Sequence, residues 1–206
     1  MSATMAYRME RRAILAGLLA AGGALSARAA ERAGEVQNSR GECYAQMATA
    51  RRTLRPDAPL FVGDAVATGA QSALGMHLGE ATEVRLGAES NLRIDRFIVN
   101  AGGVLVLERG AMLYDRNPGA GGDSSDVAVR TPYGLLAVRG TRFFAGPSNG
   151  VFGVFVERGA VTVVGVNTAV LVTDGQGTDL ARPGAEPTSP HPWGKARIAD
   201  AMASVS

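Results

Sequence analysis

Residues able to do chemistry are few in this chain of 206 residues, and their spacing assembles no catalytic set. The two histidines, His77 and His191, stand far apart in the sequence. Gly119 to Ser125 is rich in glycine, but it holds no lysine and opens no helix, so we do not expect it to cradle a phosphate. The sequence therefore predicts a protein that is not an enzyme and needs no cofactor, with a secreted enzyme as a remote alternative.

Metal ligands are also not expected to converge. Cys43 is the only cysteine, which excludes an intrachain disulfide and a thiolate metal site, and we expect it to be a small buried apolar side chain. Five aspartates could bind calcium, but their spacing does not match a calcium-binding loop. We expect them to be solvated turn carboxylates: Asp64, Asp95, Asp115, Asp123 and Asp126.

Three arginines between Val127 and Phe143 form the candidate surface for a partner: Arg130, Arg139 and Arg142. Arginine forks suit partners that carry carboxylates. The alternative is that these arginines pair with nearby acidic residues and only keep the domain soluble.

The face of the strand on which Arg139 and Arg142 lie depends on the backbone at Gly140. Strict alternation along a strand would place Arg142 on the same face as Val138. A bulge at Gly140 would shift the phase by one residue, so that Thr141 and Phe143 return to the core. Arg139 and Arg142 would then lie outside.

The elements that position these residues are expected to be short β-strands. From about Leu60 to Val172, β-branched or alternating runs are separated by turns rich in glycine and asparagine. Glu108-Arg109-Gly110 is echoed by Glu157-Arg158-Gly159, and we expect a corner at each of these glycines. Two copies do not establish a repeat array. The predicted fold is all-β: a single glycine-cornered, solenoid-like or sandwich-like domain of short strands.

Other segments are expected to differ. Residues 42–52 have helical propensity, and residues 195–202 could form a short helix. The stretch from Arg182 to Trp193 holds four prolines and should be an extended, unpacked linker. The expected organisation is a signal peptide over 1–29, the all-β domain over 30–180, and a proline-rich linker with a short tail over 181–206.

The N-terminus has the order of a secretory signal. Basic residues precede an uncharged run of 13 residues, Ala13 to Leu25, and Ala27 and Ala29 then mark a cut after Ala29. Arg11 and Arg12 suggest the twin-arginine route, with an ordinary Sec signal nearly as well supported. An uncleaved membrane anchor is the alternative, although the run is short for a bilayer.

Removal of residues 1–29 changes the charge. Those residues hold four of the 21 basic and one of the 19 acidic residues, which leaves a net charge of −1. A domain this balanced has no basic footprint for nucleic acid. We therefore expect no nucleic-acid partner and no stable membrane span after cleavage.

Several short motifs in order resemble the FecR-type periplasmic domain. Val129-Arg130-Thr131-Pro132 and Val138-Arg139-Gly140-Thr141-Arg142-Phe143 resemble the central signature of that family. Upstream stretches that begin at Val62 and Leu86, and one that begins at Leu107, follow in the family's order. The motif residues for which we expect structural roles are Gly63, Asp64, Thr68, Gly69, Gly110, Thr131, Pro132, Gly140, Thr141, Phe143 and Gly159.

The resemblance implies an all-β, solenoid-like domain, with strands over residues 34–61 in place of the helix that propensity favours. Signalling members of the family place a sigma-factor-binding segment and a transmembrane helix before this domain. Here we expect a signal peptide in that place, so we do not carry over the transmembrane signalling role. The expected function is an exported, non-catalytic binding or scaffold module of the bacterial cell envelope, in the periplasm or secreted, acting in signalling or envelope assembly. Its partner would be an envelope protein or, alternatively, a cell-wall glycan or other polysaccharide.

Overall fold

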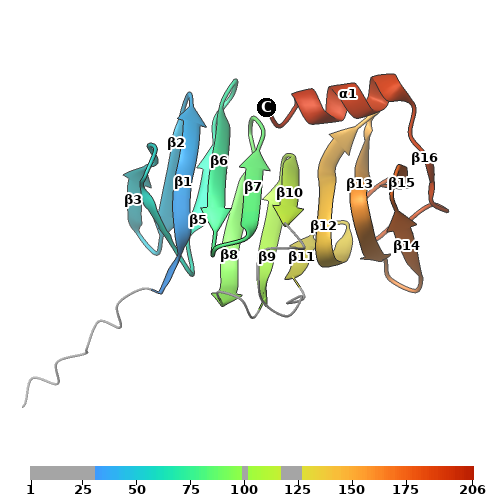
Figure 1. Cartoon of the computed structure of the whole chain (residues 1–206), viewed down its shortest axis with the longest axis horizontal. Coiled ribbons are helices and arrows are strands. Elements are labelled where there is room, and N and C mark those ends of the chain that lie inside the picture. Colours follow the sequence, from blue (N-terminus) through green and yellow to red (C-terminus); the bar gives the residue numbers. More distant parts are fainter. Residues whose placement is uncertain (1–30, 99–101, 117–126) are drawn as a thin grey trace, which may run out of the picture.

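The computed structural model describes residues 31–98, 102–116 and 127–206. These residues form one 16-stranded sheet and one short helix, which confirms the all-β class (Figure 1). The strands are β1 (Arg32–Arg40), β2 (Cys43–Met47), β3 (Ala50–Thr53), β4 (Pro59–Phe61), β5 (Ala65–Thr68), β6 (Ala73–Leu78), β7 (Thr82–Leu86), β8 (Asn91–Ile98), β9 (Gly102–Arg109), β10 (Met112–Arg116), β11 (Val127–Thr131), β12 (Gly134–Ser148), β13 (Val151–Val164), β14 (Ala169–Thr173), β15 (Gln176–Leu180) and β16 (His191–Pro192). The helix is α1 (Lys195–Ala203).

The sheet turns back on itself at β12. The first half of β12 pairs with β11, and its second half pairs with β10. One arm of the sheet therefore runs β3-β2-β5-β8-β9-β11, and the other runs β10-β7-β6-β1-β4. Leu92 and Leu105 from the first arm share one hydrophobic core with Met76 and Leu86 from the second. Burial of both inner faces in this core stabilises the fold.

Corner glycines divide the long strands. Gly140 has a φ of +59°, and the register of β12 against β13 shifts between Arg139 and Arg142. Thr141 and Phe143 are both buried at 0% exposure, as the phase shift requires. In β13, Gly159 has a φ of +91° and separates the half that pairs with β15 from the half that pairs with β14.

Gly140→Val is expected to lower the free energy of unfolding by about 1–3 kcal/mol, because a β-branched side chain strains a left-handed backbone. Urea unfolding followed by circular dichroism measures this loss. An unchanged midpoint would show that the strand tolerates a Cβ at its corner.

The helix expected over residues 42–52 is wrong, because this segment forms the hairpin of β2 and β3. Cys43 and Ala45 face the core, while Tyr44 and Gln46 lie on the outer side. This alternation has the two-residue period of a strand. Pairing with β5 on the other side of β2 overrides the local helical propensity.

The unpacked linker expected over residues 182–193 is also wrong. β16 pairs with β15, and the Glu186 carboxylate accepts hydrogen bonds from the backbone N–H groups of Asn167 and Thr168. Trp193 is only 6% exposed. The short helix predicted after this segment is present as α1, and Figure 1 shows it lying across the ends of the strands near β12 and β13.

The predicted domain boundaries stay a prediction. Arg11, Arg12, Ala27 and Ala29 of the predicted signal lie outside the described residues, as do Asp123 and the rest of residues 117–126. Within the described ranges, α1 is too short to cross a bilayer, and no other helix is long and apolar enough to do so.

Candidate functional site

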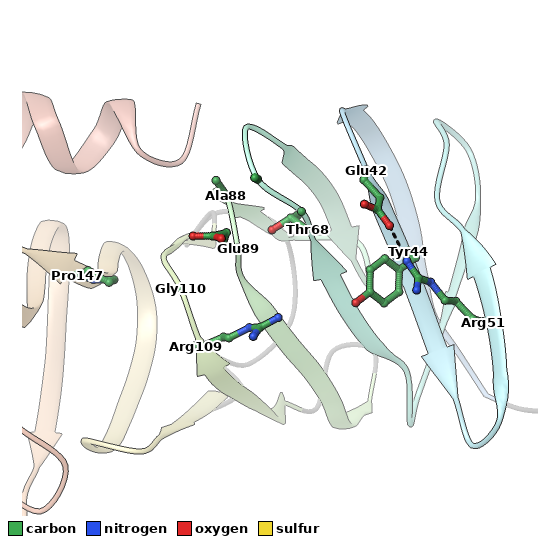
Figure 2. Close-up of a pocket in the computed structure, with 11 residues that line it drawn as sticks. Glu42, Tyr44, Arg51, Thr68, Ala88, Glu89, Arg109, Gly110 and Pro147 are labelled. Carbon is green, nitrogen blue, oxygen red and sulfur yellow. Dashed lines mark hydrogen bonds and ion pairs between the residues drawn. The ribbon is translucent and has the colours of Figure 1, made fainter.

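A polar cleft of about 590 Å³ opens at one end of β2, β5, β8 and β9, which we call the corner cleft (Figure 2). Backbone corners that follow β5, precede β8 and follow β9 form its rim. The cleft is lined by Glu42, Tyr44, Arg51, Thr68, Gly69, Ala70, Ala88, Glu89, Arg109, Gly110 and Pro147.

Buried hydroxyl groups tie the corners of the rim together. The Ser90 backbone N–H donates to Thr68 Oγ1 at 2.9 Å, and the Ala111 N–H donates to Ser90 Oγ at 3.0 Å. The Glu42 N–H donates in the same way to Ser72 Oγ at 2.9 Å. Thr68, Ser72 and Ser90 are at most 3% exposed. The hydroxyl groups of these three residues therefore position the rim, and their hydrogen bonds to the backbone occupy them.

Two of the four charged side chains of the cleft form an ion pair with each other, and the other two do not. Arg51 Nη2 lies 2.6 Å from the Glu42 carboxylate, and its guanidinium covers the Tyr44 ring at 3.5 Å from the ring centroid. Arg109 and Glu89 are exposed, and neither forms an ion pair within the described ranges. Figure 2 shows Arg109 reaching from β9 toward Tyr44. A carboxylate entering the cleft would meet the Arg109 guanidinium.

The two Glu-Arg-Gly copies differ in this respect. Arg158, the counterpart of Arg109, lies 2.7 Å from the Asp115 carboxylate. Sequence reasoning noted the echo but did not select Arg109. It also missed Tyr44 and Arg51, because it assigned residues 42–52 to a helix.

The three arginines selected from the sequence do not gather into one patch of described side chains. Arg130 is 61% exposed and lies 3.9 Å from Asp95 on β8. Arg142 lies 2.7 Å from Asp115 on β10 and 2.6 Å from Glu157. The side chain of Arg139 is outside the description, although its backbone pairs with Ala160.

Arg142 is held by its two carboxylates. Burial lowers the pKa of its guanidinium, but hydrogen bonds to Glu157 and Asp115 outweigh that effect and raise the pKa overall. A partner would have to displace both carboxylates to reach Arg142. This arrangement agrees with the alternative in which acidic neighbours neutralise the arginines, and a partner role for Arg142 stays a prediction.

Asp64 departs from the expected solvated turn carboxylate. It is 0% exposed, and it accepts hydrogen bonds from Arg52 Nη1 and from the Phe61 backbone N–H, each at 2.8 Å. The hydrogen bond to Asp64 raises the pKa of the Arg52 guanidinium. Gly63, at a φ of +96°, makes the turn that points this carboxylate inward. The Gly63-Asp64 motif thus closes the end of the core near β3 and β4.

Thr131 and Pro132 also have a structural place. Thr131 Oγ1 accepts hydrogen bonds from the backbone N–H groups of Tyr133 and Gly134, each at 3.1 Å. This bonding shapes the tight turn between β11 and β12, where Pro132 is exposed.

Gly146-Pro147-Ser148-Asn149-Gly150 has the Gly-x-Ser-x-Gly pattern of a nucleophile turn, which the sequence-based prediction missed. It spans the end of β12 and the hairpin turn before β13, whereas a nucleophile elbow joins a strand to a helix. Ser148 Oγ accepts a hydrogen bond from Arg197 Nε at 2.9 Å. A guanidinium cannot accept the proton of a serine hydroxyl, so this contact does not activate Ser148.

Metal-ligating side chains do not cluster in the part of the chain that the structure describes, where no group of three or more His, Cys, Asp or Glu side chains is found. Cys43 is 1% exposed, and burial raises the pKa of its thiol. Its thiol is therefore a poor nucleophile and metal ligand.

Comparison with known proteins finds a family match over part of the chain and a partly shared fold. Residues 64–162 match the family described as FecR protein. Two crystal structures of a candidate anti-sigma factor from Parabacteroides distasonis ATCC 8503, at 1.65 Å and 2.50 Å resolution, are similar to this chain with a TM-score of 0.54 and 15% identity. Each similarity covers 66% of this chain and 62% of that chain, so it shows a shared fold over part of both. No curated protein matches the chain.

Proposed function

Because residues 64–162 form a FecR domain, we propose that this protein is a non-catalytic binding module of a bacterial cell envelope that takes part in signalling by holding a protein partner. The family match is the observation that carries this proposal. Similarity to a candidate anti-sigma factor supports a regulatory setting. The corner cleft supplies a place for the partner, since Arg109 offers a guanidinium that no described carboxylate occupies.

The same family match supports a periplasmic location, because domains of this family are typically periplasmic. Residues 1–29 would direct the chain there through the Sec or twin-arginine route. The folded sheet would act as a short solenoid, in which the corners at Gly110 and Gly159 and the buried hydroxyls of the rim hold successive turns together.

A protein partner suits the cleft better than a glycan does. Sugar-binding sites commonly use an open aromatic face, and Tyr44 is the aromatic side chain that lines the corner cleft. Its ring is covered by the Arg51 guanidinium, which is itself held by Glu42. A sugar would have to displace this paired arginine before it could stack.

Arg109→Glu tests the proposal. Tagged wild-type protein should capture a partner from envelope fractions, and the variant should retain about tenfold less of it, because a reversed charge repels a carboxylate. Quantitative mass spectrometry of cross-linked eluates measures the ratio. Arg182→Glu is the control, since Arg182 is also exposed but lies outside the cleft. Equal capture by wild type and Arg109→Glu would remove the cleft from the proposed function.

A further inference from the structure

The outer face of the arm that contains β8, β9 and β11 carries a group of arginines. On β8, Leu92 and Ile94 are fully buried, so Arg93 between them points outward. Arg93 pairs with Val106 on β9, which pairs with Arg130 on β11, so the two arginines flank one valine in a single cross-strand row. Arg96 extends the group, and we call Arg93, Arg96 and Arg130 the arginine face. Arg109, at the end of β9, belongs to the corner cleft.

Ion pairs occur on both arms of the sheet. Arg51 pairs with Glu42 and Arg52 with Asp64 near β3, while Arg85 pairs with Glu83 on β7 and both Arg142 and Arg158 pair with Asp115. On the arginine face the described ion pair is Arg130 with Asp95, at 3.9 Å. Arg93, Arg96 and Arg109 have no ion pair among the described residues. Arg93 and Arg96 therefore present guanidinium groups that no described carboxylate pairs with.

An apolar groove continues from this face toward β14. The cross-strand row that starts at Arg96 and Val104 continues through Ala128, Ala137, Thr162 and Leu171. The small side chains of this row leave a shallow groove of about 360 Å³. Leu171, at the end of the row, is 58% exposed. Leu171 and the groove thus form an apolar strip that continues the row of the arginine face.

We propose that the arginine face and this groove together bind an extended, carboxylate-rich segment of the protein partner, which rests on the proposed function. From β8 to β14 the row takes five steps between neighbouring strands, roughly 24 Å, which about seven extended residues would span. Carboxylates at one end of the segment would pair with Arg93 and Arg96. An apolar side chain at the other end would contact Leu171 in the groove.

The experiment uses the full exported chain and two fluorescent peptides of about twelve residues. One peptide has glutamates in its first half and leucine near its end, and the other has glutamine in place of each glutamate. We expect the glutamate peptide to bind about tenfold more tightly than the glutamine peptide in fluorescence anisotropy, and salt to weaken that binding. Arg93→Glu together with Arg96→Glu should weaken it by about tenfold or more.

The matched control is Arg55→Glu together with Arg182→Glu, which makes the same change in net charge at two exposed arginines away from this face. It should bind the glutamate peptide like wild type. Equal weakening by both double variants, no binding to wild type, or preferential binding to phosphatidylglycerol vesicles would each overturn the proposal. If Arg109→Glu abolishes capture of the envelope partner while Arg93→Glu with Arg96→Glu leaves it intact, the proposed function is supported and the binding role of the arginine face is disproved.

Discussion

Gly110→Ala is expected to lower the free energy of unfolding by about 3 kcal/mol or more. Gly110 has a φ of +84°, so any Cβ there is strained. The Cβ would also lie 2.4 Å from the Cα of Ser90, which is backbone and cannot rotate away. The corner would have to move, and the hydrogen bonds between Ser90 and Ala111 would be lost with it. Equilibrium unfolding in urea measures the change.

Gly150→Ala provides the matched control. Gly150 has a φ of +79°, close to that of Gly110, but no atom lies within 4 Å of the position its Cβ would take. It should therefore show only the backbone cost, about 1–2 kcal/mol. If the two variants lose equal stability, the close packing of the corner against Ser90 makes no contribution of its own.

Much of the sheet could be predicted from the sequence because many strands show the β-branched composition or the two-residue alternation of a β-strand. Runs such as Val161 to Val164 are β-branched, and Thr82 to Leu86 alternates apolar with polar residues. The corner at Gly140 could also be predicted, because only a phase shift brings Thr141 and Phe143 to the same side of the strand as Leu136 and Val138. These features depend on neighbours within a few residues, which a single sequence displays.

The features that were missed depend on distant partners. Asp64 is buried together with its hydrogen bond from Arg52 on β3, and the residues next to Asp64 in the sequence do not indicate that contact. The prolines after Arg182 suggested a linker, but side chains such as Glu186 supply hydrogen bonds that anchor the segment. Propensity favoured a helix around Ala45, where pairing with β5 decides for a strand.

The arginine face is a consequence of strand order. β9 pairs in parallel with β11, while β10, which lies between them in the sequence, joins the other arm. This crossover places Arg130 beside Val106 and Arg93. The sequence-based grouping placed Arg130, Arg139 and Arg142 within one strand pair, with Arg139 and Arg142 on its outer face. In the structure, the described partners of Arg142 lie on β10 and β13.

Trp193→Ala is expected to lower the free energy of unfolding by about 3–5 kcal/mol, because it empties a packed site. The indole stacks on Phe155 at 5.2 Å between ring centroids, and it occupies space that any Cβ at Gly153 or Gly177 would enter. On its other side Arg197 covers the ring at 3.6 Å and is held by Asp179. Urea unfolding measures the stability, and hydrogen exchange over α1 reports whether the helix stays docked.

Loss of the indole should release α1 as well as weaken the core. A helix of nine residues is not stable in water without packing, and the apolar contacts of α1 belong to the small cluster that contains Trp193, Phe144 and Ala201. Trp193→Phe is the control, since it keeps an aromatic ring and removes an indole N–H that has no described hydrogen-bond partner. It should lose less than half as much stability. If Trp193→Ala leaves the exchange protection of α1 unchanged, the helix is held by other contacts, such as the hydrogen bond from Arg40 to the Ser206 carbonyl.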